Sequence, residues 1–168
     1  SALAFDRAAR LYRKAIELSK EKENLRIALA EKYRQQGRTD ESEKELVAII
    51  KDYNSQRARK VMAENKLDLG KVADAKPIVD AILKENGKDL DGLYLKGRIA
   101  FAERRLDDAK ALFSDVVRQD AGMARARLYS GLIDVQQGRL DVGRKEIAEA
   151  VRLDPSDARG QLIFGEIS

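Results

Sequence analysis

The sequence of 168 residues contains no cysteine, no histidine and no tryptophan, and only two prolines. Without cysteine the chain has no disulfide and no thiol chemistry. Without histidine or cysteine it lacks the commonest general base and nearly all zinc ligands. Catalysis would have to depend on carboxylates, lysine, tyrosine or serine. We therefore expect a protein that is not an enzyme, with no cofactor and no metal site.

Long apolar runs are also missing, since no window reaches 18 consecutive apolar residues. The charged side chains of the first 20 residues include Asp6, Arg7, Arg10, Arg13, Lys14 and Glu17. These features exclude a membrane-spanning helix and an uncleaved signal sequence in the given chain. We interpret the start at Ser1, without methionine, as a trimmed or processed chain, and we expect a fragment of a longer protein.

Charge is abundant but is not concentrated in one place. Charged residues make up 37% of the sequence and aromatic residues 5%, with a net charge of +4. Basic and acidic residues alternate along the chain, with six of each in residues 90–123 and again in residues 124–157. A phosphate-binding surface needs lysine and arginine without neighbouring carboxylates. Nucleic-acid binding is therefore disfavoured, and most of these charges are expected on solvated helix faces.

Residues of similar size recur every 34 positions, with a single 33-residue interval. One column contains only small residues: Ala30, Ala63, Gly97, Gly131, Gly165. A second small column follows: Ala8, Ser42, Ala75, Ala109, Gly143. Two further columns are mostly large and apolar: Tyr12, Leu46, Val79, Phe113, Ile147 and Ala15, Ile49, Ile82, Val116, Ala150. The apolar spacings of three and four residues predict helices, and a period of this length is typical of stacked helical repeats.

Each repeat is interpreted as two helices joined by a short turn. The turn contains Gly37, Gly70 or Gly138, with Arg104 at the equivalent place, and this position suits a left-handed residue that ends a helix. Aspartates follow the turns, and we expect them to be helix N-caps: Asp6, Asp40, Asp107, Asp141. Asp40 and Glu43 would form a capping box.

The two prolines give separate expectations. Asp154-Pro155-Ser156 is expected to end a second helix, because the residue before proline disfavours the helical region. Pro77 lies within another predicted second helix. We expect that helix to begin near Asp74, which would place Pro77 in the first turn, where its missing amide hydrogen costs nothing.

The chain resembles the tetratricopeptide repeat family. The resemblance rests on the 34-residue period, the small residue late in each first helix, the small residue that opens each second helix, the large apolar residue four positions later, and Pro155. The family's usual tryptophan is absent, and Ser130 and Asp134 replace apolar residues. Asp134 would lie in an apolar seam and would need a hydrogen-bond partner or water.

The resemblance implies an all-α fold, a right-handed α-solenoid of antiparallel helix pairs that forms a superhelix. We expect one continuous domain with four repeats and a half repeat at each end: a second helix at 1–22, repeats at 23–55, 56–89, 90–123 and 124–157, and a first helix at 158–168. Single helix pairs bury too little apolar surface to fold alone, so neighbouring repeats must stabilise one another.

Members of this family hold peptides or partner helices on an inner face lined by first helices. The resemblance implies a non-catalytic protein-protein interaction scaffold that binds a protein or peptide partner there. The expected contact residues are Arg57, Lys60, Glu64, Tyr94, Arg98, Phe101, Arg125, Leu128, Leu132 and Val135. The apolar residues and arginines suit a segment with aliphatic and acidic side chains. Alternatively, Leu128, Leu132 and Val135 pack against the helices of the neighbouring repeat.

Other functions stay open. The lysine-asparagine pair with which some members of the family clamp a chaperone's terminal carboxylate is not reproduced, because the matching positions hold Lys60 with Glu64 and Tyr94 with Arg98. Self-association through the open ends of the array is one alternative, since Leu162, Ile163, Phe164 and Ile167 lack a following helix to cover them. A helical-repeat nucleic-acid binder is the other.

The general sequence pattern of the repeats is similar to that of bacterial envelope and exopolysaccharide-secretion arrays. This similarity suggests a periplasmic or envelope-associated protein, with the cytoplasm as the alternative.

Overall fold

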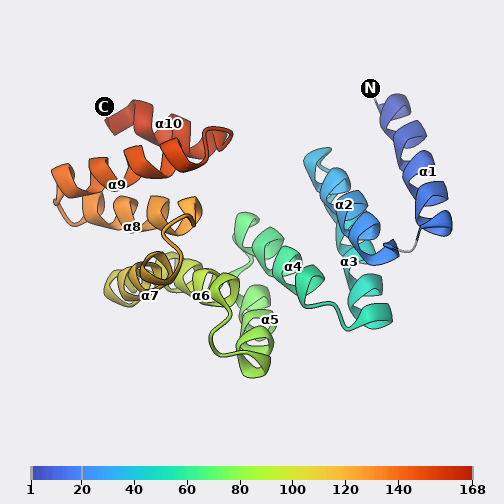
Figure 1. Cartoon of the computed structure of the whole chain (residues 1–168), viewed down its shortest axis with the longest axis horizontal. Coiled ribbons are helices and arrows are strands. Elements are labelled where there is room, and N and C mark those ends of the chain that lie inside the picture. The colour runs from blue at the N-terminus through green and yellow to red at the C-terminus, as the bar shows by residue number, and fades with distance from the viewer. Residues whose placement is uncertain (1, 20, 168) are drawn as a thin grey trace. The chain divides into compact units, whose positions relative to one another are not determined.

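The computed structural model of the chain describes residues 2–19 and 21–167. This described part contains ten helices and no strand (Figure 1). The all-α class expected from the sequence is confirmed. The chain divides into two compact units, which are unit 1 over Ser1–Asn65 and unit 2 over Lys66–Ser168. None of the ten helices is long and apolar enough to cross a membrane.

Unit 1 contains α1 (Ala2–Leu18), α2 (Lys22–Gln35), α3 (Thr39–Tyr53) and most of α4 (Gln56–Asp68). Helix α1 packs against α2, and α2 packs against α3. The core between α1 and α2 is built on Ala9, Leu29 and Tyr33, with Phe5 and Tyr12 among the residues packed against them. Leu46 and Ile49 of α3 are also buried.

Helix α1 uses only part of the face that the sequence columns predict, namely Tyr12, which packs against the core between α1 and α2. Ala8 and Ala15 occupy those columns and are exposed, whereas the neighbouring Ala9 is buried. In complete hairpins, these columns mark the face that a second helix turns toward its own first helix. Helix α1 instead packs on the helix that follows it, so an adjacent face is buried.

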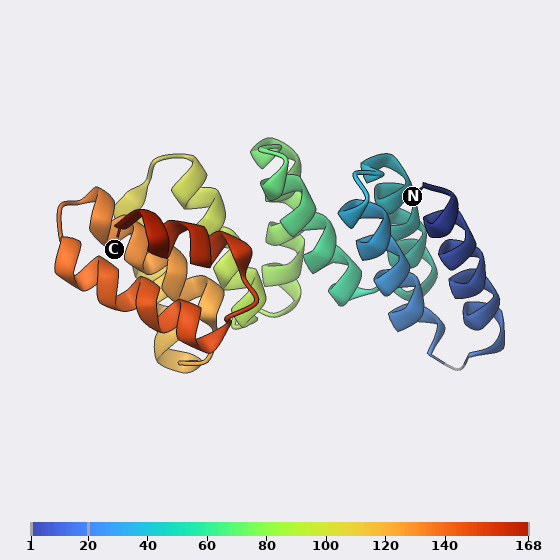
Figure 2. The ribbon, with the colours of Figure 1, turned by 90° about the horizontal axis from the view of Figure 1, so that it is seen from above.

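Unit 2 contains the end of α4 followed by α5 (Val72–Glu85), α6 (Leu90–Ala102), α7 (Leu106–Gln119), α8 (Ala124–Gln136), α9 (Leu140–Leu153) and α10 (Ala158–Ile167). From α5 onward, each helix packs against the next along the chain. Figure 2 shows α9 in orange beside α10 in red. Val79, Phe113 and Ile147 from the third column are 0% exposed, which confirms that second helices bury this face.

The hairpin turns adopt the expected left-handed conformation. Gly37, Gly70 and Gly138 have φ angles of 73°, 71° and 80°, and Arg104 has a φ angle of 62°. The residue after each turn donates its amide hydrogen to a carbonyl five positions earlier, as in the bond from Arg38 to Tyr33 at 2.9 Å. This pattern ends one helix and leaves a single residue before the next.

The predicted N-caps are wrong. Helices α3, α7 and α9 begin after Arg38, Arg105 and Arg139, which occupy the cap positions without a side-chain cap hydrogen bond. The aspartates of the predicted capping sites lie inside the first turn, and Asp6 lies inside α1, so the Asp40–Glu43 capping box is also not formed. Negative charge in a first turn still favours the helix through its dipole.

The proline predictions have opposite outcomes. Helix α9 ends at Leu153, directly before Asp154 and Pro155, as expected. Helix α5 begins at Val72, two residues before the expected start at Asp74, so Pro77 is the sixth helical residue and not part of the first turn. The early start follows from the tight turn at Gly70, after which Lys71 is the only residue before α5.

Candidate functional site

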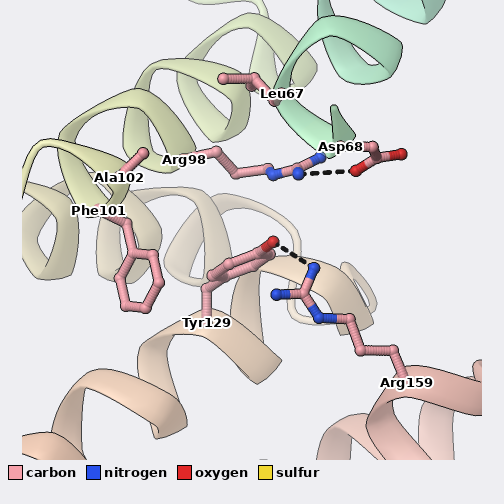
Figure 3. Close-up of a pocket in the computed structure, with 7 residues that line it drawn as sticks. All are labelled: Leu67, Asp68, Arg98, Phe101, Ala102, Tyr129 and Arg159. Carbon is pink, nitrogen blue, oxygen red and sulfur yellow. Dashed lines mark hydrogen bonds and ion pairs between the residues drawn. The ribbon is translucent and has the colours of Figure 1, made fainter. Parts of the chain in front are cut away.

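A cleft of about 510 Å³ opens in unit 2. Its walls come from α4, α6 and α8, each of which is followed by a short turn and a second helix, and from α10. The lining residues, all in unit 2, are Leu67, Asp68, Arg98, Phe101, Ala102, Tyr129 and Arg159 (Figure 3). The last turns of α4 and α6, the middle of α8 and the first turn of α10 therefore supply one site.

An ion pair forms one side of the cleft. The Nη2 atom of Arg98 donates to Oδ1 of Asp68 at 2.8 Å, and the Arg98 side chain is only 7% exposed. Burial by itself lowers the pKa of the Arg98 guanidinium, but Tyr94, Tyr129 and Asp68 together raise the pKa above its ordinary value. Arg98 is therefore a permanent, buried positive charge.

Tyr129 lies between this ion pair and α10. Its hydroxyl accepts a hydrogen bond from Nη1 of Arg159 at 2.8 Å. The guanidinium carbons of Arg98 and Arg159 lie 5.5 and 5.2 Å from the centre of its ring. At these distances the ring attracts both cations electrostatically. Figure 3 shows Arg159 directed toward the Tyr129 hydroxyl, with Arg98 and Asp68 across the opening.

A cluster of aromatic rings packs around Tyr129. The sequence has only five tyrosines and four phenylalanines, and four of these rings meet here. Tyr129 stacks on the fully buried Phe113 at 5.3 Å and meets the edge of Phe101 at 5.4 Å, and Tyr94 contacts both Phe113 and Tyr129. Rings packed in this way have few alternative rotamers, so Tyr129 is held in place for its two arginines.

The cleft has an excess of positive charge. Its lining contains two guanidinium groups, of Arg98 and Arg159, and one carboxylate, of Asp68. In the part of the chain that the structure describes, no carboxylate lies within ion-pair distance of the Arg159 side chain. Leu67, Phe101 and Ala102 add an apolar wall. Among residues 2–19 and 21–167, no group of acidic side chains is arranged to hold a metal ion.

Two residues of the predicted inner face, Arg98 and Phe101, line the cleft. Tyr94 lies beneath them and is 3% exposed. Arg125 lies over the Tyr94 ring at 5.0 Å and pairs with Asp91 at 3.7 Å. Tyr94 and Arg125 therefore adjoin the site without lining it.

The three aliphatic residues of the predicted face belong to the core. Leu128 is 3% exposed and forms a cluster with Ile147 and Ala150, and Leu132 and Val135 pack against that cluster. Ile147 and Ala150 belong to the second helix of the same repeat, whereas Ile163 and Phe164 of α10 pack against this cluster from the neighbouring repeat, as the alternative interpretation expected. Their part in partner binding has no support from the geometry, because their apolar surface is used within unit 2.

The other three predicted residues, Arg57, Lys60 and Glu64, lie on α4 within unit 1. Arg57 is exposed and donates from Nη1 to Oδ1 of Asn24 at 2.9 Å. Lys60 and Glu64 are half-buried. None of these three lines the cleft of unit 2.

Tyr129 and Arg159 line the cleft but were not predicted from the sequence as site residues. A signal for Arg159 exists, because it stands 34 residues after Arg125 and continues the column of Arg57, Asp91 and Arg125. Tyr129 stands one position after the Leu128 column and has no such signal. The periodicity marks equivalent places in each repeat, whereas the cleft uses different turns of α6, α8 and α10.

Asp134, the polar residue expected in an apolar seam, has hydrogen-bond partners. Asp134 is 1% exposed, and its two carboxylate oxygens accept from Nζ of Lys110 at 2.7 Å and from Nη2 of Arg139 at 2.6 Å. Burial alone would raise the pKa of Asp134, but the hydrogen bonds from Lys110 and Arg139 lower it below its ordinary value. This network joins α7 to α8 and to the start of α9.

Comparison with protein families agrees with the fold. Two models described as tetratricopeptide repeat match the chain, one over residues 4–64 and the other over residues 61–124 and 94–158. None of the curated proteins compared with the chain matches it.

Solved structures with the same fold come from distant proteins. A thermophilic protein with these repeats from Thermus thermophilus, TTC0263, is 16% identical, with a TM-score of 0.77 over 99% of this chain and 92% of its own. YrrB, described as a protein with these repeats and an unusual peptide-binding site, is 19% identical, with a TM-score of 0.59 over 98% and 85% of the two chains. A chain of the APC/C hetero-tetramer Cut9–Hcn1 has a TM-score of 0.81 at 13% identity, over 99% of this chain and 34% of that chain.

These matches extend over nearly the whole sequence, and the helix pairs, left-handed turns and buried columns agree with them. The fold in general supports protein-protein interaction, and proteins that carry it generally bind protein or peptide partners. With a family model matched over more than half of its length, the chain belongs to the tetratricopeptide repeat family.

Proposed function

We propose that this chain is a non-catalytic scaffold that holds a segment of a partner protein in the cleft of unit 2. The observation that carries this proposal is the cleft itself, in which four helices supply an apolar wall and two guanidinium groups. Peptides are commonly recognised by such a combination of side-chain pocket and charge. The absence of histidine and cysteine from the sequence supports a binding role over catalysis.

The size of the cleft favours a short segment over a folded domain. Sites that hold small ligands or a few side chains have volumes of about 300–1,000 Å³, and the cleft has about 510 Å³. Its walls are also preorganised, since Arg98 and Tyr129 are buried and held by the aromatic cluster. Preorganised walls reduce the entropy lost when a flexible peptide binds.

Peptide display against the full chain tests the proposal. Ala102 is exposed at the cleft, so Ala102→Trp fills the opening without removing a packed side chain. Ala111 is exposed on α7, and Ala111→Trp adds the same bulk outside the cleft. We expect selected peptides to lose binding to the Ala102→Trp variant and to keep it with Ala111→Trp. Peptides that bind both variants equally, or the absence of any selected peptide, would rule out the cleft as the partner site.

Self-association is a second candidate function. On α1, Leu3, Leu11 and Leu18 are 77%, 70% and 82% exposed, and on α10 Leu162 is 65% exposed. Exposed apolar faces of this kind can mark contacts with another protein. Sedimentation velocity over a concentration series tests this function, with Leu11→Glu as the disrupting variant. A chain that stays monomeric at high concentration would exclude it.

The proposed cellular setting rests on the general sequence pattern of the repeats, which is similar to that of repeat arrays in bacterial envelope and polysaccharide-secretion assemblies. We place the scaffold in the periplasm or at the envelope, with the cytoplasm as the alternative. Fractionation of cells that produce the protein tests this placement. Recovery with the soluble cytoplasmic fraction would contradict it.

A further inference from the structure

We propose that the cleft of unit 2 is a carboxylate site, in which an acidic side chain of the partner segment binds to Arg98 and Arg159 and displaces Asp68 from Arg98. This inference rests on the proposed function and adds the chemistry of the partner. It also gives Asp68 a specific part, as an internal competitor that occupies the site when no partner is bound.

The buried guanidinium of Arg98 is the group that requires an anion in the cleft. Its side chain is 7% exposed and lies against the rings of Tyr94 and Tyr129. A buried guanidinium without a carboxylate is costly, because the desolvation of the charge is not compensated. In the structure, Asp68 supplies this carboxylate at 2.8 Å. Any ligand that takes the place of Asp68 must therefore bring a negative charge.

Arg159 adds a second cation without a second carboxylate. Its partner in the structure is the neutral Tyr129 hydroxyl, at 2.8 Å. A guanidinium has five N–H donors and binds carboxylates through two parallel hydrogen bonds. Arg98 and Arg159 both lie within 6 Å of the Tyr129 ring centre, at 5.5 and 5.2 Å. One incoming carboxylate can therefore interact with both cations, whereas Asp68 pairs with Arg98.

Asp68 is placed so that it can be displaced. It is the last residue of α4, and its side chain is 37% exposed, unlike that of its partner Arg98. A carboxylate at a helix end with access to water can turn outward and be solvated at little cost. The Asp68–Arg98 pair thus keeps the empty cleft neutralised on one side without closing it.

The apolar wall indicates what stands beside the acidic residue. Leu67, Phe101 and Ala102 line the same cleft as the two arginines. Aliphatic side chains of the partner can cover this wall and exclude water from the ion pairs, which strengthens them. The expected partner is thus an extended segment with an aspartate or glutamate flanked by aliphatic residues.

Fluorescence anisotropy with two short capped peptides tests the inference. One peptide has a central aspartate flanked by leucines, and the other has asparagine in its place. We expect the acidic peptide to bind the full chain about tenfold more tightly than the neutral one, as is typical of one charge-assisted hydrogen-bonded pair. Equal binding of the two peptides, or no binding of the acidic peptide, would overturn the inference.

The direction of the change in the Asp68→Asn variant separates competition from simple structural support. If Asp68 competes with the partner, its neutralisation tightens binding of the acidic peptide by about fivefold. If Asp68 only supports the wall, the affinity stays the same or falls, which contradicts the inference. Asp115→Asn is the matched control, because Asp115 pairs with Arg118 on α7 outside the cleft. We expect the control to change affinity by less than about twofold.

A second variant keeps the test decisive if Asp68→Asn fails to fold. Arg159 is exposed, and Arg159→Gln is expected to preserve the fold and to weaken binding of the acidic peptide about tenfold. Arg118→Gln removes an equivalent exposed charge elsewhere, with no expected effect. Unchanged binding to the Arg159→Gln variant would overturn the inference. If displayed peptides bind the cleft but lack acidic residues, the inference fails while the proposed function stands.

Discussion

At the scale of single residues, buried charges in unit 2 have partners from neighbouring helices. Asp134 on α8 receives hydrogen bonds from Lys110 on α7 and from Arg139, which directly precedes α9. Arg98 on α6 binds Asp68 at the end of α4. Each pair joins residues from different helices, so these charges help to fix the packing of the helices. The charges of each pair also compensate one another.

The Asp134→Asn variant is expected to lose about 1–3 kcal/mol of unfolding free energy at pH 7, because buried charge-assisted hydrogen bonds are removed. The pKa of Asp134 is lower in the folded protein than in the unfolded chain, where an aspartate has a pKa of about 3.9. Its stabilising effect is thus complete above about pH 4 and is lost as the pH falls through the folded-state pKa.

Urea unfolding of wild type and variant at pH 7 and near pH 3 measures this effect. The difference between the two proteins should shrink at the lower pH. The control Asp115→Asn, on the surface of α7, should change stability by no more than about 0.5 kcal/mol. A difference between wild type and Asp134→Asn that does not depend on pH would contradict the linkage.

At the scale of elements, the repeating unit depends on a left-handed turn and on close helix contact. Three turns use glycine at the left-handed position, and the fourth uses Arg104 with a φ angle of 62°. A residue with a Cβ atom is strained in this region, by about 1–2 kcal/mol. Of the four hairpin turns, the α6–α7 turn is therefore the one that lacks glycine, the most favourable residue at this position.

The Arg104→Gly variant should raise the free energy of unfolding by about 1 kcal/mol, after allowance for the greater freedom of glycine in the unfolded chain. Thermal or urea unfolding measures the gain. Arg104→Ala serves as the control, since it removes the same side chain and keeps the strained Cβ. If alanine stabilises as much as glycine, the arginine side chain is responsible and the backbone argument fails.

Two glycines of one sequence column give opposite predictions for the same change. A Cβ atom on Gly131 would lie 2.8 Å from Cγ1 of Ile147 and 2.9 Å from the carbonyl oxygen of Gly143. Gly131→Ala should therefore cost about 1–3 kcal/mol through overpacking, and the larger Gly131→Leu should cost at least as much. A Cβ atom on Gly165 meets nothing within 4 Å, so Gly165→Ala should stabilise α10 by up to about 1 kcal/mol.

Chemical denaturation of the two alanine variants under identical conditions gives both values. A loss at Gly131 and a gain at Gly165 would place the close helix contact at α8 and α9. Equal effects would show that helix propensity alone, and not the crossing, determines the change.

The sequence predicted the elements better than their first residues. The period and the small columns predicted the helix pairs, and Gly37 predicted a left-handed turn, because steric limits on φ leave few alternatives. The starts of α3 and α5 were each missed by two residues. Hydrogen bonds across the turn, from Arg38 to Tyr33 and from Lys71 to Lys66, decide where the next helix begins, and composition does not reveal them.

The candidate site could be predicted only in part for a related reason. Arg98 and Phe101 follow from the columns, since both lie on the predicted face of a first helix. Tyr129 and Arg159 depend on how far each first helix is offset against the next. That offset comes from packing, for example of Phe113 beneath Tyr129, and a single-repeat alignment carries no information about it.

At the scale of the whole molecule, two compact units each consist of helices that pack mainly on their neighbours along the chain. Such arrays leave the side chains of first helices available for a partner, because the core lies between the helices of each pair. In unit 2 this surface contains a preorganised, positively charged cleft. The proposed function therefore belongs to a surface and requires no reacting group.

Photo-cross-linking tests this claim most directly. A photoreactive amino acid replaces either Ala102 at the cleft or Ala111 on α7 in the full chain, and each protein is irradiated with a peptide selected by display. Mass spectrometry then locates the attached peptide. We predict attachment from position 102 and none above background from position 111. Attachment from position 111 alone, or equally from both positions, would contradict it.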